Sequence, residues 1–304
     1  MKTEINGRIV KLPDFLIVGA GKSGTTSLYN YLKQHPQIFM PEIKEPKFFA
    51  FAETPTAFTH PKGSTIIWNF DEYISLFEPA RDDQMLGEAS PIYLRYYETT
   101  IRNIKKYITT WKSARIIMIL RNPVDRAFST YSMYRLANIE PLEFEEAILP
   151  EIVKERIENN WARGFDYLGI SYYKSIKAYM DNFQHIKIYL YEDLKSDPLW
   201  LIKDIFKFLG IDDSFTPDIS KKYMVSSIPR SQLLRRILQS QYLMHFFFFI
   251  PTKKRDEIRK KILHKNLKQL KMKRETRRYL VDFYKEDIVG LQKLIERDLL
   301  HWLE

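Results

Sequence analysis

The residues best suited to chemistry lie near the N-terminus, in a run of glycines and hydroxyl side chains around Lys22. Gly19, Gly21 and Gly24 fall within six positions, and residues 21–26 read Gly-Lys-Ser-Gly-Thr-Thr. Glycines let the backbone turn sharply and approach a ligand closely. Backbone N–H groups, hydroxyls and one ammonium group together favour an anion, so this segment predicts a phosphate-binding loop.

A second cationic group follows the apolar run 115–120. The Asn-Pro pair at 122–123 is typical of a helix N-terminus, so a helix is expected directly after a strand. Arg121 then lies at the tip of the strand, and Arg126 and Ser129 share one face of the helix. Guanidinium and hydroxyl groups in this arrangement could hold a second phosphate through charge-assisted hydrogen bonds.

The elements that must position these groups alternate between short apolar strands and helices. Strands are predicted at 15–18, 115–120 and 186–190, and residues 85–93 are expected to form a short strand that runs into a proline turn. Helices are predicted at 27–32, 141–161, 172–182, 198–208 and 275–302. Alternation of this kind predicts crossover connections and a parallel sheet. We therefore expect an α/β, P-loop-like three-layer fold, with a central parallel sheet flanked by helices and a helical C-terminal extension. It would form one domain over 1–304, with a nucleotide-binding core at 14–232 and a basic extension at 233–304.

The composition narrows the class of protein. The chain has 304 residues, of which 45% are hydrophobic and 14% aromatic, and these are values typical of globular domains. It has no cysteine, which excludes disulfides and thiolate chemistry and fits a reducing compartment. Residues 1–13 lack the apolar core of a signal peptide, and no window is apolar for long enough to cross a membrane. The sequence predicts a cytoplasmic protein, with membrane association as an alternative.

The positive charge is concentrated near the C-terminus. Residues 253–278 contain thirteen Lys or Arg and three acids, an excess of ten that equals the net charge of +10 of the whole chain. Apolar residues recur at helical spacing from Ile258 to Leu270, which predicts an amphipathic helix preceded by Phe246–Phe249. Contact of 246–278 with an anionic membrane and a merely solvated helix are both compatible with this pattern. The absence of interleaved aromatics argues against a nucleic-acid partner.

Two phosphate motifs point to a known family. An NTPase loop of the form G-x-x-x-x-G-K-[ST] would need glycine at position 16, where the chain has Leu16. Residues 21–26 instead resemble the 5′-phosphosulfate loop of sulfotransferases that use 3′-phosphoadenosine-5′-phosphosulfate (PAPS). Residues 121–131 follow R-x-P-x-x-R-x-x-S-x-Y, which resembles the 3′-phosphate site of the same family. Lys-Glu-Pro-Lys-Phe-Phe at 44–49 is similar to the segment that carries the catalytic glutamate in glycosaminoglycan sulfotransferases, and the resemblance extends from residue 14 to 302.

This resemblance implies a PAPS-dependent sulfotransferase of the glycosaminoglycan (heparan sulfate) type. It would move a sulfuryl group, without a metal, to a hydroxyl or amine of a carbohydrate, a glycolipid or a similar acceptor, and release adenosine 3′,5′-bisphosphate (PAP). Glu45 would be the general base, and Lys22 would stabilise charge on the bridging and leaving oxygens. The nucleotide would be held by Gly21, Lys22, Ser23, Gly24, Thr25, Thr26, Arg121, Ser129 and Arg230, the last in a loop with Lys221 and Lys222.

The sequence leaves the roles of several residues open, and it is compatible with two other functions. Some members of this branch carry a second acid where this chain has Ala50, and residues 68–73 resemble the aromatic segment that walls the acceptor site in the same branch. His60 fits a solvated loop as well as an acceptor site, and Glu88 could contact a substrate or brace a loop. A P-loop kinase or NTPase that uses ATP and Mg²⁺ would want an acid after a buried strand, and Glu192-Asp193 follows the strand at 186–190. The basic segment would also suit a membrane- or polyanion-binding protein without catalysis.

Overall fold

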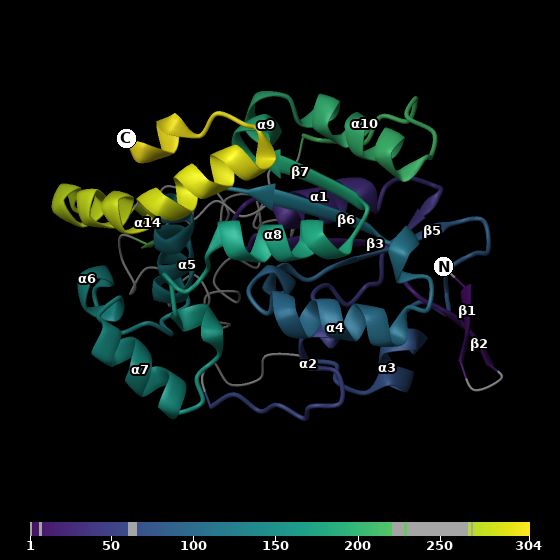
Figure 1. Cartoon of the computed structure of the whole chain (residues 1–304), viewed down its shortest axis with the longest axis horizontal. Helices are drawn as coiled ribbons and strands as arrows, with labels where there is room; N and C mark the ends of the chain where they lie inside the picture. Colours follow the sequence, from purple (N-terminus) through teal and green to yellow (C-terminus); the bar gives the residue numbers. More distant parts are fainter. Residues whose placement is uncertain (1, 6–7, 60–65, 221–227, 230–266, 269) are drawn as a thin grey trace, which may run out of the picture.

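A five-stranded sheet forms the centre of the computed structural model, which describes residues 2–5, 8–59, 66–220, 228–229, 267–268 and 270–304. The strand order is β4-β5-β3-β6-β7, and all neighbours are parallel, as the sequence predicts. The strands are β3 (Phe15–Gly19), β4 (Ile38–Phe39), β5 (Met85–Ala89), β6 (Arg115–Leu120) and β7 (His185–Leu190). Strand β3 lies in the middle, so the loop that follows it has β5 and β6 on either side (Figure 1).

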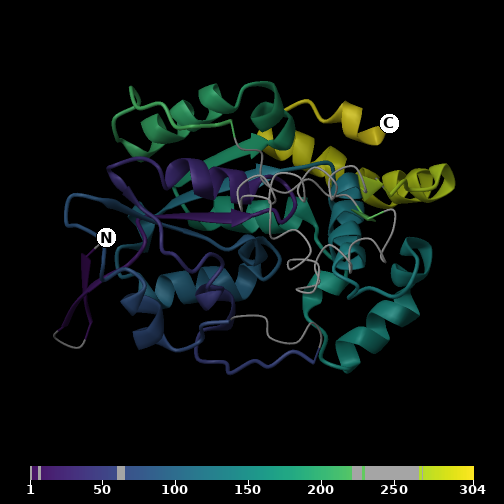
Figure 2. The ribbon, with the colours of Figure 1, turned by 180° about the vertical axis from the view of Figure 1, so that it is seen from behind.

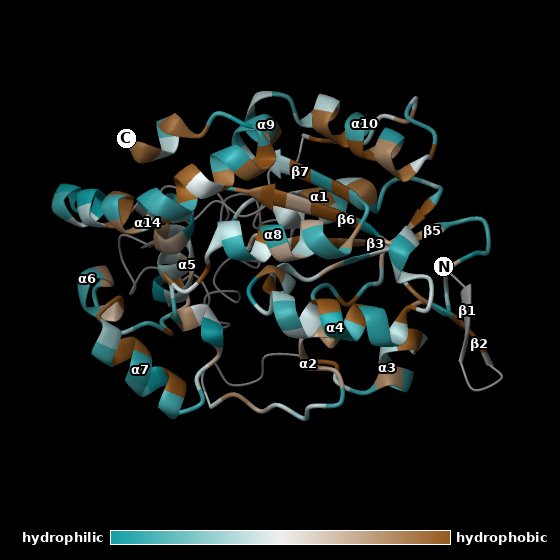
Figure 3. Cartoon of the chain, in the orientation of Figure 1, coloured by the Kyte–Doolittle hydropathy of each residue, from teal (hydrophilic) through white to brown (hydrophobic). Residues whose placement is uncertain are grey.

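Both faces of the sheet are covered, which explains why the central strands are apolar without interruption. In β3, Leu16 and Val18 belong to one buried cluster, while Phe15 and Ile17 belong to a second cluster on the opposite face. Figure 3 shows these central strands as mostly hydrophobic and the outer faces of the surrounding helices as more hydrophilic. The sheet is therefore the middle layer of three.

Different helices pack on the two faces. The first face is covered by α4 (Tyr97–Tyr107), α8 (Tyr172–Asn182) and α14 (Arg274–Ile295), which lie in front in Figure 1. The second face carries α1 (Thr25–Leu32), α9 (Tyr191–Ser196) and α10 (Pro198–Leu209), seen from their own side in Figure 2. Within the described ranges, no helix combines the length and apolar character needed to cross a membrane.

Local capping explains where several helices begin and end. The side chain of Asn122 accepts a hydrogen bond from the N–H of Val124 at 2.9 Å and begins α5 (Pro123–Leu136). Asp197 accepts in the same way from Trp200 at the start of α10, and Gly210 ends that helix with a φ of 75°. These boundaries were predicted because the responsible residues are local in sequence.

The remaining elements are short and connect the layers. They are β1 (Lys2–Ile5), β2 (Arg8–Lys11), α2 (Phe48–Phe51), α3 (Phe70–Ser75), η1 (Pro91–Leu94), η2 (Trp111–Ser113), α6 (Phe144–Ala147), α7 (Pro150–Glu158), η3 (Arg163–Phe165) and η4 (Leu300–Leu303).

Three predicted helices differ from the structure. The stretch 141–161 is divided into α6 and α7 because Pro150 starts a new helix. The closing helix ends at Ile295, where Glu296 adopts a left-handed φ of 52°. The predicted basic helix does not extend to Leu270, because Leu267–Lys268 form β9, which pairs with β8 (Ile228–Pro229). Residues 253–266 and Phe246–Phe249 lie outside the described residues.

Candidate active site

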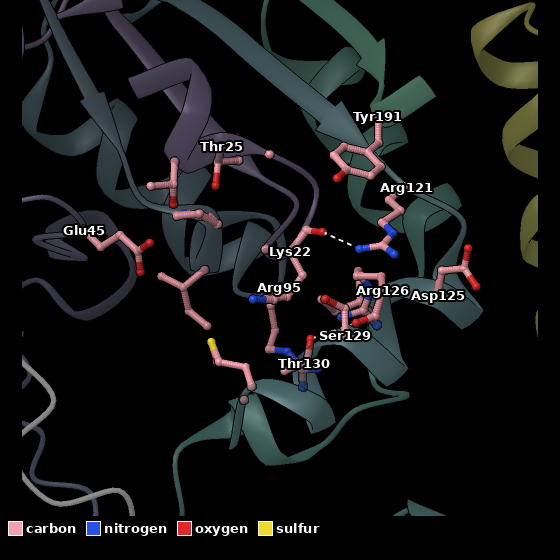
Figure 4. A pocket seen from close by; sticks show the side chains of 18 of the residues that line it. Lys22, Thr25, Glu45, Arg95, Arg121, Asp125, Arg126, Ser129, Thr130 and Tyr191 are labelled. Atoms are coloured by element: carbon pink, nitrogen blue, oxygen red, sulfur yellow. Dashed lines mark hydrogen bonds between the residues drawn. The ribbon is translucent and has the colours of Figure 1, made fainter. Parts of the chain in front are cut away.

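The site lies at the edge of the sheet where the parallel strands end. The loop after β3, Pro91 after β5, Arg121 after β6 and Tyr191 after β7 border one cavity of about 760 Å³. Ligands of open α/β sheets bind at this edge, where connections diverge to opposite faces. Figure 4 shows Glu45 on one side of the cavity, Arg121, Asp125 and Ser129 on the other, and Lys22 between them.

The predicted phosphate loop turns sharply from β3 into α1. Lys22 has a φ of 65° and Gly24 a φ of 98°, both in the left-handed region. A Cβ atom at Gly24 would lie only 2.5 Å from Leu194, so this position requires glycine for space as well as for its backbone conformation. The N-cap of α1 is Gly24, which has no side chain to accept from the first turn, and Thr25 and Thr26 of that turn line the cavity.

The members of this loop do not all face the cavity. Gly21, Lys22, Gly24, Thr25 and Thr26 line it, whereas Ser23 is fully buried and is not part of the lining. The hydroxyl of Ser23 lies near that of Tyr172 in the core. The side chain of Ser23 is thus not part of the cavity wall, and its role in nucleotide binding stays a prediction.

Lys22 and Arg121 bring two positive charges together. The guanidinium Nη1 of Arg121 donates to the carbonyl oxygen of Lys22 at 3.2 Å, and its carbon lies 5.0 Å from the ring centre of Tyr191. The pKa of Lys22 is lowered to about 8, first by burial and then by the charge of Arg121, while Glu45 opposes the shift. An anion placed between these cations would offset the cost of burying the ammonium group and its repulsion by Arg121.

Helix α5 places the other predicted 3′-phosphate residue on the same wall. Ser129 is buried and lines the cavity together with Arg126. A hydrogen bond holds the side chain of Arg126 in place, since its Nη2 donates to the carbonyl oxygen of Tyr167 at 2.9 Å. Arg126 therefore braces α5. Asp125 in the first turn of α5 forms an ion pair with Arg277 of α14 at 2.8 Å, which ties the C-terminal helix to this wall.

Glu45 lies on the opposite wall, in the loop before α2. The ammonium group of Lys44 donates a short hydrogen bond to the Glu45 carboxylate, whose side chain is 39% exposed. Glu45 has a φ of 60° and Lys47 a φ of 63°, so the backbone turns at both residues. Ala50 is buried in α2 and brings no second carboxylate to the cavity.

A buried network holds this loop in place. The N–H of Lys47 donates to the hydroxyl of Ser90 at 3.0 Å, and the N–H of Phe49 donates to Tyr93 at 3.2 Å. The Tyr93 hydroxyl in turn donates to the carboxylate of Glu88 at 2.8 Å.

Glu88 supports this loop through Tyr93 and does not line the cavity. Tyr73 donates to the same carboxylate oxygen at 2.9 Å, and Glu88 is 1% exposed. Burial raises the pKa of Glu88 to about 7, although hydrogen bonds from Ser90, Tyr93 and Tyr73 oppose the shift. Of the two roles left open for Glu88, the structure supports bracing.

Sequence reasoning missed several lining residues. Lys47, Arg95, Tyr96, Tyr134, Tyr191 and Lys195 also line the cavity. The aromatic segment expected to wall the acceptor site, 68–73, packs elsewhere, and Tyr73 is in the core. Lys47 was recognisable, since it stands two residues after Glu45. His60, Lys221, Lys222 and Arg230 lie outside the described residues.

Of the two acids after β7, Asp193 has a structural role. The Asp193 carboxylate accepts from the N–H of Leu190 at 2.8 Å and forms an ion pair with Arg297 at 2.9 Å. Among the described residues that line the cavity, neither Glu192 nor Asp193 appears. Asp193, one of the two acids that left an NTPase possible, is thus engaged in contacts within the fold.

Known proteins resemble this chain over most of its length. The sulfotransferase domain family matches residues 12–291. A crystal structure of a sulfotransferase from Alicyclobacillus acidocaldarius is 31% identical, with a TM-score of 0.74, and covers 97% of this chain and 100% of that chain.

Two curated relatives are much longer proteins. The membrane-associated sulfotransferase kil1 of Dictyostelium discoideum is 35% identical over 130 residues, which are 42% of this chain and 24% of that protein. The bifunctional heparan sulfate N-deacetylase/N-sulfotransferase 4 of Mus musculus is 26% identical over 301 residues, which are 94% of this chain and 30% of that protein. The chain thus spans less than a third of either relative, and its similarity to heparan sulfate sulfotransferases is distant. It belongs to the sulfotransferase domain family.

Proposed function

We propose that this domain transfers the sulfuryl group of PAPS to a hydroxyl group, with Glu45 as the general base. The observation that carries the proposal is the position of Lys22 between Glu45 and the wall formed by Arg121 and Ser129 (Figure 4). The cationic wall suits the phosphates of the donor. The carboxylate opposite suits the proton of an acceptor hydroxyl.

Each group has one task in the proposed reaction. Glu45 takes the proton of the acceptor hydroxyl as the new oxygen–sulfur bond forms. The bond between sulfur and the bridging oxygen of the donor breaks, and the Lys22 ammonium neutralises the charge left on the phosphate. Since a sulfuryl group carries less charge than a phosphoryl group, fixed cations suffice for this proposal without a metal.

The donor would be held at two points. Backbone and hydroxyl groups of residues 21–26 would bind the 5′-phosphate at the start of α1. Arg121 and Ser129 would bind the 3′-phosphate, and the excess positive charge near Lys22 supports an anionic ligand here. Arg230 stays a prediction for the same nucleotide.

The class of acceptor, the domain boundaries and the cellular location are also proposals. The similarity to a heparan sulfate N-deacetylase/N-sulfotransferase supports a carbohydrate-type acceptor, and a place near that branch, only distantly. A glycolipid acceptor stays a prediction from the sequence. We keep the sequence-based predictions of one domain over 1–304, of cytoplasmic location and of peripheral membrane contact through 246–278. Transfer to an amine in place of a hydroxyl is the alternative reaction.

The donor site is tested by calorimetry with PAP and 5′-AMP. If Arg121 and Ser129 bind the 3′-phosphate, PAP should bind more tightly by roughly 2–4 kcal/mol. Equal affinities would contradict the proposed 3′-phosphate site.

The base is tested by Glu45→Gln, with transfer of labelled sulfate from PAPS as the readout. Turnover should fall by about 10² to 10⁴ while PAP affinity is kept, because the amide cannot accept the proton. Glu42→Gln is the matched control, since Glu42 is close in sequence but has an 89% exposed side chain and lies outside the cavity lining. Near-normal transfer by Glu45→Gln would place the base elsewhere.

A further inference from the structure

Arg126 is a buried cation that lines the cavity and is only 3% exposed. Two other largely buried guanidinium groups are each paired with an acid, Arg95 with Asp166 at 3.0 Å and Arg156 with Glu140 at 2.8 Å. Within the described ranges of the chain, Arg126 forms no such ion pair. Burial of a charge without an opposite charge is costly, so Arg126 is suited to an anion that enters the cavity.

The hydrogen bonds of Arg126 leave part of its guanidinium group unused. Its Nη2 donates to the carbonyl oxygen of Tyr167 at 2.9 Å, whereas its buried Nε has no hydrogen-bond partner in the part of the chain that the structure describes. A guanidinium group carries five N–H donors in one plane, so a single anchoring bond fixes its orientation and leaves others for a ligand. Buried donors are almost always paired, which again points to a ligand.

The position of Arg126 indicates which ligand this is. Figure 4 shows Arg126 beside Ser129 and across the cavity from Glu45, which marks the acceptor side. Arg126 and Ser129 are three positions apart on α5 and share one face of that helix. Burial lowers the pKa of Arg95; Asp166 opposes this shift, and the charge of Arg126 adds to it. Two cations that repel each other favour an anion, and the anion proposed for this side is the nucleotide.

A buried network holds the residue to which Arg126 is anchored. The hydroxyl of Tyr167 donates to Oε2 of Glu140 at 2.6 Å, and Arg156 donates to both oxygens of that carboxylate, each at 2.8 Å. The guanidinium carbon of Arg156 lies 4.7 Å from the ring centre of Trp161 and 5.5 Å from that of Phe165. Among the described residues that line the cavity, none of these five appears. The network therefore fixes the Tyr167 carbonyl without touching a ligand.

We propose that Tyr167, Glu140 and Arg156 are positioning residues, which hold Arg126 as a further residue that binds a phosphate group of the donor. This inference rests on the proposed function, because the ligand it concerns is PAPS. The Tyr167 carbonyl holds one edge of the guanidinium group, and the remaining N–H groups bind phosphate oxygens through charge-assisted hydrogen bonds. Bracing of α5 and binding of the donor are thus two tasks of one side chain.

The test is a double-mutant cycle on the affinity of the intact chain for PAP, measured by calorimetry. Arg126→Gln should weaken PAP binding about tenfold or more, because a charge-assisted contact is lost. Tyr167→Phe removes only the hydroxyl that contacts Glu140 and should weaken PAP binding about fivefold. The double variant should bind PAP as Arg126→Gln does, since Tyr167 acts through Arg126.

Tyr189→Phe is the matched control. Tyr189 is 2% exposed, and its hydroxyl donates to the Asp204 carboxylate at 2.7 Å, much as Tyr167 donates to Glu140. Tyr189 lies outside the described lining of the cavity. Loss of this hydroxyl should lower the melting temperature, as in Tyr167→Phe, but leave PAP affinity unchanged. A loss of affinity confined to Tyr167→Phe is therefore not a general effect of reduced stability.

The same titrations with 5′-AMP identify the phosphate group. A loss in Arg126→Gln that affects PAP and spares 5′-AMP assigns Arg126 to the 3′-phosphate. An equal loss for both nucleotides assigns it to the 5′-phosphate. Either result supports the inference.

Several outcomes would overturn it. Unchanged PAP affinity in Arg126→Gln removes Arg126 from the donor site, and unchanged affinity in Tyr167→Phe removes the positioning role. A Tyr167→Phe effect that persists in the Arg126→Gln background shows that Tyr167 acts by another route. If Tyr167→Phe does not fold, Arg126→Lys decides, since it keeps the charge but not the planar donors, and PAP binding as tight as in the original chain contradicts the inference. If the original chain itself does not bind PAP, the proposed function is wrong.

Discussion

The guanidinium group of Arg121 donates a hydrogen bond to the carbonyl oxygen of Lys22 across 3.2 Å. This contact joins the end of β6 to the loop after β3, two strands that are neighbours in the sheet. It holds two cations close together, and burial with the charge of Arg121 lowers the pKa of Lys22 to about 8. Like charges held in this way disfavour the ligand-free state and favour an anion, which is why the pair is suited to a nucleotide with two phosphate groups.

Replacement of Arg121 by Ala should weaken PAP binding more than 5′-AMP binding. The variant would lose a charge-assisted contact to the 3′-phosphate, which we expect to cost roughly 2–4 kcal/mol for PAP. Calorimetry with both nucleotides gives the two affinities. Arg102→Ala on the exposed side of α4 serves as the control and should bind both as the original chain does. An equal loss for both nucleotides would show that Arg121 acts only by holding the Lys22 loop.

PAP affinity should decrease as the pH rises above about 8, the pKa to which Lys22 is lowered in the free protein. The ammonium form dominates below this value, and the neutral amine formed above it offers no charge to the 5′-phosphate. If only the charged form binds, affinity falls about tenfold for each pH unit above the pKa. Titrations between pH 7 and 9.5 measure this fall. Lys22→Arg should show a flat profile, and a similar fall in that variant would assign the titration to another group.

Glu88 should make folding stability depend on pH between about 4.5, its ordinary pKa, and about 7, its raised pKa in the folded chain. In this window the folded state binds the proton more tightly than the unfolded state, so stability is greatest at the acid end and decreases as the pH rises. The raised pKa corresponds to about 3 kcal/mol of stability, which is lost progressively as the pH rises from about 4.5 to about 7.

Glu88→Gln is the variant that isolates this effect, because its carbonyl oxygen can still accept from Tyr73 and Tyr93. Chemical denaturation between pH 5 and 8 should show a smaller loss of unfolding free energy in the variant. An identical pH dependence in the two proteins would mean that Glu88 is not the titrating group.

The network around Glu88 also shows why part of the site was beyond sequence reasoning. The Gly-Glu-Ala-Ser sequence at 87–90 does not reveal whether Glu88 touches a substrate or supports a loop. Only the folded chain brings Tyr73 of α3 and Tyr93 of η1 to its carboxylate and buries it. Ser23 is a similar case, since the loop motif does not reveal that its side chain turns into the core.

The sequence by itself determined four of the five strands of the central sheet, several helix boundaries, and the family to which the chain belongs. Those features depend on residues that are near one another in the chain: the apolar run of β3, the cap at Asn122, the glycine at 210 and the loop around Lys22. The tertiary structure decided which of these residues meet. Phe58 and Phe128 line the same cavity although seventy positions separate them, and Arg121 reaches Lys22 because β3 and β6 are adjacent. Contacts of this range depend on strand order and on packing across the sheet, which no local pattern encodes, so the lining of the acceptor side emerged only from the folded chain.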